Sequence, residues 1–182
     1  MADENLQSLR SQPFALLLAL EQAVLGAAGR VQRKEGLWVG VAFLSGGHAY
    51  IASRSEIREV ITWPEATRVP RTQPWLRGLA NVRGQLVPVT DLGQWAGGAE
   101  TTLTRNSRVI VVNHPDIPAG ILVDQVMGFR RYSSREASPL PEGIPDLLAP
   151  FLLGAYAHEN EHWGVLVLHD LVESDAFLHA AS

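Results

Sequence analysis

The sequence contains no cysteine and a single lysine, Lys34. Without cysteine, disulfide bonds and zinc sites made of thiolates are excluded, and the chain suits a reducing compartment such as the cytoplasm, where we expect it. Without further lysines, no glycine-rich loop is followed by a lysine that could hold a nucleotide phosphate. The composition therefore gives no reason to expect a bound cofactor.

Positive charge is also scarce. The formal net charge is −4, which argues against nucleic acid as a partner, because a phosphate backbone attracts basic surfaces. Apolar residues make up 46% of the chain and charged residues 19%, as in a folded globular domain. An apolar stretch near the N-terminus, residues 14–25, is too short to span a bilayer, so we expect no insertion into a membrane.

The same stretch predicts a helix. Pro13 fits the first helical turn, leucine and alanine dominate, and Gly26 follows the last residue. Nearly all faces of this helix are apolar, so we expect it to pack against its own domain, because large apolar surfaces rarely stay exposed. We interpret residues 1–36 as an N-terminal helical leader whose deletion lowers stability or causes aggregation.

Beyond residue 36 the pattern predicts many short strands separated by turn residues. Strands at a spacing of roughly 8–12 residues are typical of an all-β barrel or sandwich. Asp170 is expected to cap a last helix over residues 171–179. The expected strands are residues 37–44, 48–52, 57–62, 79–82, 86–89, 109–112, 120–126, 151–157 and 163–168.

The segment Arg77–Leu92 is the most informative part of the chain, because it contains two Arg-Gly pairs six residues apart. Glycine readily adopts the positive φ of a tight turn, so Gly84 predicts a hairpin with Arg83 at its bend. Pro88 cannot donate a hydrogen bond, which predicts that the second strand is an edge strand or contains a bulge. Asp91 is expected to cap a short helical turn that follows the hairpin.

A second motif suggests an alternative function. The residues His158-Glu159-Asn160-Glu161-His162 match the HExxH pattern of zinc hydrolases. That chemistry needs a helix, which brings the two histidines to one face. Gly154 and Gly164 flank the motif, and apolar strand residues lie on both sides, so we predict a polar hairpin tip instead. A zinc hydrolase stays as the alternative, and we assign no catalytic or metal-binding residue.

Other catalytic patterns are weaker. Ser107, His114 and Asp124 could be imagined as a triad, but no nucleophile elbow surrounds Ser107. Arg130 and Arg131 form a modest basic spot, which we interpret as a solvated loop. An oligonucleotide-binding barrel is disfavoured, because the strands do not interleave aromatic with basic residues.

The hairpin segment resembles the signature of the CheW-like domain, a family of bacterial chemotaxis adaptors that join receptors to a histidine kinase. This resemblance implies a mainly β fold of two small five-stranded β-barrels packed side by side, with an N-terminal helix and a short C-terminal helix. It places the domain at residues 37–182, the first barrel at roughly 37–100, the second at roughly 101–172 and the C-terminal helix at 170–180. The residues that carry the resemblance are Leu76, Arg77, Gly78, Asn81, Val82, Arg83, Gly84, Pro88, Val89, Asp91 and Leu92.

Scattered features resemble one branch of the family, the PilI-like adaptors of the chemosensory system that governs type IV pili and twitching motility. An adaptor of flagellar chemotaxis is the alternative, although such adaptors mostly lack the helical leader. The features are Pro13-Phe14, Glu21-Gln22, Leu37-Trp38, Gly40, Phe43, Pro74-Trp75, Pro150-Phe151, Gly154, Trp163 and Phe177-Leu178.

The resemblance implies a non-catalytic scaffold. Its first barrel would bind the regulatory domain of a CheA-type histidine kinase, and the groove between the barrels would take the cytoplasmic tip of a methyl-accepting chemoreceptor. Arg83 matches the family's partner-contacting arginine. Glu59 lies at the family's acidic position, so we expect it near Arg83, where it would orient the guanidinium. Asn81, Arg77 and Gly84 complete the expected partner-binding set.

Overall fold

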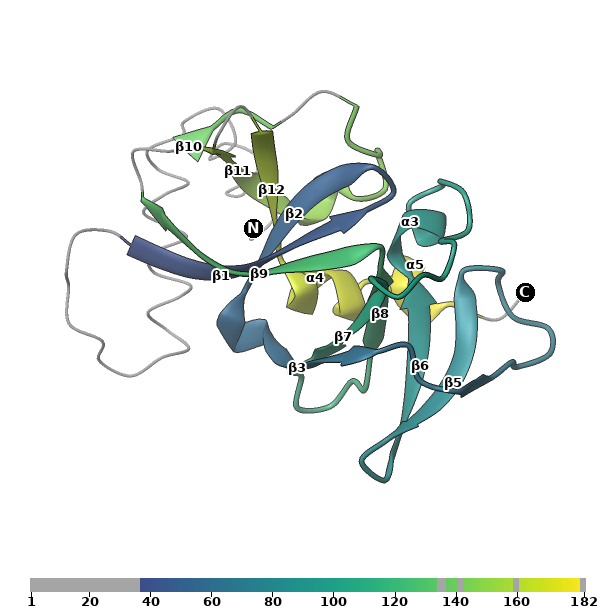
Figure 1. Cartoon of the computed structure of the whole chain (residues 1–182). Helices are drawn as coiled ribbons and strands as arrows, with labels where there is room; N and C mark the ends of the chain where they lie inside the picture. Colours follow the sequence, from purple (N-terminus) through teal and green to yellow (C-terminus); the bar gives the residue numbers. More distant parts are fainter. Residues whose placement is uncertain (1–36, 134–136, 141–142, 159–160, 181–182) are drawn as a thin grey trace.

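The computed structural model describes residues 37–133, 137–140, 143–158 and 161–180. These residues form two six-stranded sheets, with short helices beside them (Figure 1). The first sheet has the order β10-β11-β12-β2-β1-β9 and the second the order β3-β7-β8-β6-β5-β4. The first contains β1 (Leu37–Ser45), β2 (His48–Ser53), β9 (Gln125–Ser133), β10 (Ala137–Ser138), β11 (Leu152–His158) and β12 (Glu161–Leu166). The second contains β3 (Ile57–Thr62), β4 (Ala66–Thr67), β5 (Leu76–Val82), β6 (Gln85–Asp91), β7 (Arg108–Val112) and β8 (Gly120–Val123).

The helical elements are short. They are the 3-10 helices η1 (Arg54–Glu56) and η3 (Ala149–Phe151) and the α-helices α3 (Leu92–Trp95), α4 (Leu168–Glu173) and α5 (Asp175–Leu178). Within the described ranges, none is long and apolar enough to cross a bilayer. The leader helix predicted for residues 14–25 lies outside the described residues.

The mainly β architecture with few helices is confirmed, but the two sheets do not follow the predicted division of the chain into two barrels. Strands β1 and β2 pair with each other but not with β3–β8; β1 also pairs with β9, and β2 pairs in parallel with β12. The chain thus starts one sheet, builds the other from residues 57–123, and then returns. Each sheet has six strands instead of five, and among the described residues the two end strands of neither sheet pair with each other, so neither closes into a barrel.

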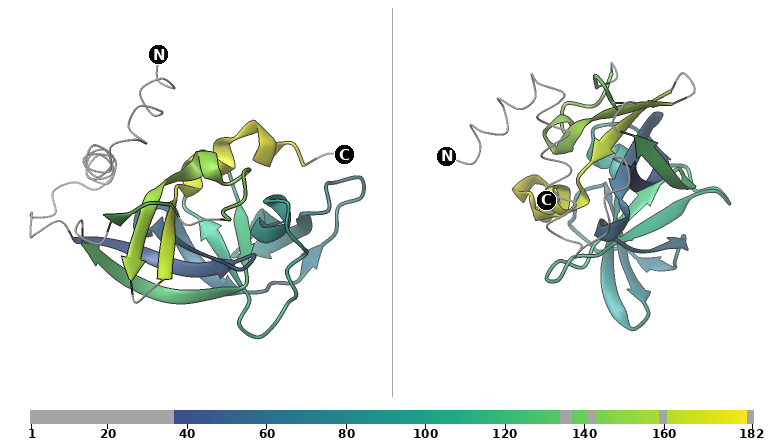
Figure 2. Two further views of the ribbon diagram at one scale, coloured as in Figure 1. Left: turned by 90° about the horizontal axis from the view of Figure 1, so that it is seen from above. Right: turned by 90° about the vertical axis from the view of Figure 1, so that its left-hand side faces the viewer.

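One hydrophobic core joins the two sheets. It includes Phe43 and Tyr50 of the first sheet, Ile110 and Ile121 of the second, and apolar side chains of α4 and α5. Each sheet also has a smaller cluster of its own. Figure 2 shows α4 and α5, in yellow, lying beside strands of both sheets. Since burying apolar area is the main stabilising contribution, this shared core holds the two sheets in one unit.

Two local predictions need correction. Arg130 and Arg131 do not lie in a solvated loop: residues 125–133 form strand β9, because β1 offers a long pairing edge. The predicted helix over residues 171–179 is divided at Ser174 into α4 and α5.

Asp170 lies inside α4 and does not cap it. The side chain of Glu56, distant in sequence, accepts hydrogen bonds from the backbone N–H groups of His169, at 3.0 Å, and Leu168. Burial raises the pKa of the Glu56 carboxyl, although these hydrogen bonds oppose the shift. The first turn of α4 is therefore held by a residue that no local sequence pattern could indicate.

The prediction for Pro88 is wrong, because β6 is not an edge strand and the bulge of the β5–β6 pair lies on β5, at Arg77. Strand β6 is an interior strand, but β8 pairs with it only from Val89 onward. At Pro88 the strand has β5 on one side, opposite Leu79, and the missing N–H removes no bond of the parallel ladder.

Candidate functional site

The hairpin turn between β5 and β6 has the predicted form. Gly84 has a φ of 84°, and Val82 pairs with Gln85 across the turn. Arg83 also has a positive φ, of 53°, which disfavours any residue with a Cβ by about 1–2 kcal/mol. The side chain of Asn81 accepts a hydrogen bond from the Gly84 N–H at 2.8 Å and so stabilises this turn. Positive φ at both central residues is what a two-residue hairpin turn of type I′ requires.

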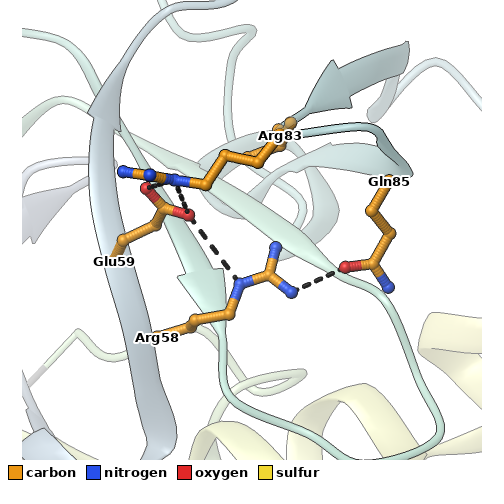
Figure 3. A pocket seen from close by; sticks show the side chains of 5 residues that line it. Arg58, Glu59, Arg83 and Gln85 are labelled. Atoms are coloured by element: carbon orange, nitrogen blue, oxygen red, sulfur yellow. Dashed lines mark hydrogen bonds and ion pairs between the residues drawn. The ribbon is translucent and has the colours of Figure 1, made fainter.

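The predicted proximity of Glu59 and Arg83 is confirmed (Figure 3). The Nε atom of Arg83 donates to both carboxylate oxygens of Glu59, at 3.0 and 2.9 Å. Glu59 comes from β3, an edge strand of the same sheet, and its side chain is 18% exposed, whereas that of Arg83 is 81% exposed. The pair therefore holds one end of an arginine whose remaining N–H groups face solvent.

Two neighbours extend this pair into a polar surface that sequence reasoning missed. Arg58 lies with its Nε atom 3.9 Å from Glu59 and donates from Nη1 to the side chain of Gln85 at 2.6 Å. Together with Val82 these side chains line a shallow depression of about 400 Å³ (Figure 3). We call this the hairpin surface. Simple alternation along β3 would put Arg58 and Glu59 on opposite faces, so no strand pattern in the sequence indicated Arg58; the register of β3 shifts between Ile57 and Glu59.

Arg77, by contrast, lies in the interior. Its side chain is 9% exposed, and its Nη1 atom donates to the buried carboxylate of Asp91 at 3.0 Å. It also pairs with Glu100 at 3.0 Å and lies over the ring of Trp63. Its Nη1 and Nη2 groups make contacts within the chain, and the partner contact expected for Arg77 stays a prediction.

Asp91 has the predicted capping role and a further one. Its Oδ1 atom accepts from the Gln94 N–H at the start of α3. It also accepts from the hydroxyl of Thr101, while Oδ2 accepts from the Thr101 N–H. The carboxylate thus ties the end of β6 to the segment beyond α3, and Arg77 balances its charge.

The HExxH motif lies on a hairpin, as predicted, and not on a helix. His158 ends β11, opposite Glu161 in the register, and His162 lies on β12 opposite Ala157. The histidines therefore lack the helical spacing that a zinc hydrolase uses to share one metal. Across the part of the chain that the structure describes, no group of three or more candidate metal ligands occurs.

A separate apolar surface lies on the first sheet, along its edge strand β9. Phe129 is 68% exposed, and its ring lies 5.9 Å from the guanidinium carbon of Arg54 on η1. Val39 on β1 is a diagonal neighbour of Phe129, because Val41 pairs with Phe129 and Val39 with Arg131. Met127, also exposed, occupies the bulge of β9. We call Val39, Met127 and Phe129 the β9 surface.

Comparisons with known proteins agree with the architecture and the motif. The sequence profile of the CheW-like domain matches residues 39–176. Protein PilI of Pseudomonas aeruginosa is 34% identical over 172 residues, which cover 93% of this chain and 96% of PilI. Chemotaxis protein CheW of Bacillus subtilis is 30% identical over 104 residues, which cover 57% of this chain and 67% of that protein.

The fold has a solved counterpart. The crystal structure of the scaffolding protein TtCheW from Thermoanaerobacter tengcongensis matches with a TM-score of 0.65 at 25% identity, covering 76% of this chain and 94% of that one. A profile that matches most of the chain, together with a relative aligned along nearly its whole length, shows that this protein belongs to the CheW-like family, whose members are non-catalytic adaptors.

Proposed function

We propose that this protein is a signal-transduction adaptor that couples a chemoreceptor to a CheA-type histidine kinase on the cytoplasmic side of the membrane. The observation that carries the proposal is the ion pair of Arg83 and Glu59 at a hairpin turn. An exposed pair adds at most about 1 kcal/mol to stability. The positive φ of Arg83 belongs to the two-residue hairpin turn, which places this side chain at the tip of the hairpin.

The hairpin surface is proposed to bind the regulatory domain of the kinase. Its charged side chains are prearranged, because Glu59 fixes Arg83 and Gln85 accepts from Arg58. Prearranged side chains lose less conformational entropy on binding. Charges at such a position mainly set specificity and the association rate.

The β9 surface is proposed to bind the cytoplasmic tip of the receptor. A receptor tip is a helical hairpin, and an exposed aromatic ring beside a valine offers the apolar contact that anchors such a partner. Phe129 and Arg83 lie on different sheets, so both partners could be held at once. Kinase activity would then depend on receptor conformation through bound states, without chemistry performed by the adaptor.

Calorimetry with the full chain tests this assignment. Arg83→Glu should weaken binding to the kinase regulatory domain by tenfold or more and leave receptor binding unchanged, while Phe129→Ser should do the reverse. Leu147→Ser, a matched removal of an exposed apolar side chain, should affect neither. Wild-type affinity of both variants for both partners would refute the proposal.

We propose further that the adaptor serves a type IV pilus system. The relative PilI aligns over 93% of the chain, whereas the CheW of Bacillus subtilis aligns over 57%. Expression in a strain that lacks its PilI adaptor should restore twitching motility. Restoration of swimming in a strain that lacks CheW, without restoration of twitching, would favour the flagellar alternative.

A further inference from the structure

A second cavity lies apart from the hairpin surface and the β9 surface. It is formed where the turn between β1 and β2 meets the loop after α3 (Figure 1) and the segment that contains Pro145 and Leu148. Its volume is about 260 Å³. Binding pockets for drug-sized molecules measure about 300–1,000 Å³, so this cavity has the size for a single side chain or a small fragment.

Two buried hydroxyl groups line the cavity without a hydrogen-bond partner. They belong to Ser45 and Tyr50, whose side chains lie in the interior with 2% and 1% of their residue surface exposed. Burial raises the pKa of the Tyr50 hydroxyl, so it remains a donor at neutral pH. Because a buried hydroxyl without a partner destabilises a fold, this pair indicates a place where a ligand supplies the missing hydrogen bonds.

The charge of that ligand follows from the rest of the lining. The backbone N–H groups of Gly46, Gly97 and Gly98 line this site but already donate within the chain, to Asp124, Gln94 and Gly93. Among the described lining residues there is no carboxylate, lysine or arginine, and His48 alone could carry a positive charge. A charged group would therefore be desolvated without adequate compensation, which favours a neutral occupant.

The wall of the cavity also favours a flat group. Gly46 and Gly93 approach so closely that a Cβ on Gly93 would lie 3.4 Å from the Gly46 Cα, so this wall is bare backbone. A carboxamide is planar, and it carries two N–H donors and an acceptor oxygen. It could therefore bond a hydroxyl group either as donor or as acceptor.

We propose that this cavity binds the carboxamide of an asparagine or glutamine side chain presented by a partner protein. The site is independent of the proposed kinase and receptor surfaces. Ser45 and Tyr50 would hold the amide by hydrogen bonds, and the rings and methyl groups around them would exclude water. The small volume favours a side chain inserted from a protein surface over a larger metabolite.

Nuclear magnetic resonance of the full chain tests the proposal with two short blocked peptides that differ only in a central glutamine or glutamate. The glutamine peptide should give saturable shifts at the amides of Gly46, Gly93 and Gly97, and the glutamate peptide should give none. Tyr50→Phe and Ser45→Ala should each weaken glutamine-peptide binding about fivefold, the effect of one neutral hydrogen bond. Both variants remove only an unpartnered hydroxyl, so they should fold with an unchanged or higher melting temperature.

Matched controls make the result decisive. Tyr156→Phe, at a buried tyrosine of the other cluster in the same sheet, and Arg83→Glu, on the hairpin surface, should leave peptide binding unchanged. Three outcomes would overturn the proposal: no shift with either peptide, equal shifts with both, or full binding by Tyr50→Phe and Ser45→Ala. If neither peptide binds and both variants are also less stable than the wild type, the hydroxyls serve only a structural water, and the proposal is likewise overturned.

Discussion

The two Arg-Gly pairs of the hairpin make an instructive comparison. Arg77-Gly78 and Arg83-Gly84 have the same residues and lie six positions apart on adjoining parts of one strand-turn unit. Arg77 is 9% exposed and paired with a fully buried aspartate, whereas Arg83 is 81% exposed and paired with a partly buried glutamate. The arginine of the same dipeptide is thus buried in one place and exposed in the other.

The difference arises from the neighbours that the fold supplies. The segment around Thr101 folds back over Arg77 and closes it from solvent, while no segment covers the turn at Arg83 in the described part of the chain. Desolvation makes a buried pair sensitive to the loss of either partner, and screening makes an exposed pair nearly neutral for stability. The comparison therefore predicts opposite results for equivalent mutations.

The largest effect is expected for Arg77→Met. This change keeps a long apolar side chain but leaves the buried carboxylate of Asp91 without its counter-charge. The free energy of unfolding, measured with urea, should fall by about 3–5 kcal/mol. Arg83→Met, the matched control, should change it by less than about 1 kcal/mol. Equal effects of the two mutations would remove the distinction between them.

Exchanging the two charges of the exposed pair tests whether Arg83 contacts the kinase. Arg83→Glu combined with Glu59→Arg should rebuild an ion pair and restore any small loss of stability. Kinase binding should stay at least tenfold weaker than that of the wild type, because the partner would meet a charge of the wrong sign. Recovery of full affinity by the exchanged pair would mean that Arg83 serves only its own chain.

Substitutions of the two glycines, Gly78 and Gly84, should also differ in their effect on stability. A Cβ on Gly78 would lie 2.5 Å from the carbonyl oxygen of Thr67 on β4, whereas a Cβ on Gly84 would have no atom within 4 Å. Gly84→Ala should therefore cost only about 1 kcal/mol, for its positive φ. Gly78→Ala should cost more, about 1–3 kcal/mol for the overlap in addition to the backbone term. Thermal unfolding of both variants measures the order, and a less stable Gly84→Ala would contradict it.

The smallest effect concerns Glu56, a carboxylate held by backbone N–H groups. Burial raises its pKa above the ordinary 4.5, so the folded state holds the proton more tightly than the unfolded chain does. The stabilising contribution is complete below pH 4.5 and is lost as the pH rises through the raised pKa. The pKa of Asp170 is also raised, by burial and by Glu173, and acts in the same direction.

Glu56→Gln should therefore flatten the decline of stability above pH 4.5, since glutamine keeps an acceptor and cannot ionise. Urea titrations of both proteins between pH 4 and 7 should show that the free energy of unfolding declines less steeply with pH for Glu56→Gln than for the wild type. Parallel curves would indicate that Glu56 titrates alike in the folded and unfolded states.

Local rules explain what was predictable about the fold and the site. Turn residues and alternating apolar positions placed β1, β2, β3 and the β5–β6 hairpin within a few residues of their observed bounds. The proximity of Glu59 to Arg83 was also expected, but only from the family resemblance. Glu59 lies on β3, and in the sheet order β7 and β8 separate this strand from the β5–β6 hairpin that carries Arg83. No spacing in the sequence implies that contact.

The sequence by itself determined the strands other than β4, β9 and β10, the hairpin turn, the capping role of Asp91 and the family, because each depends on residues close together in the chain. Tertiary structure alone decided that β1 and β2 join β9 and β12, that Glu56 holds the first turn of α4, and that Arg77 lies inside while Arg83 lies outside. Sheet pairing and burial arise from the path of the whole chain, and an arginine side chain is compatible with either environment until that path supplies its neighbours.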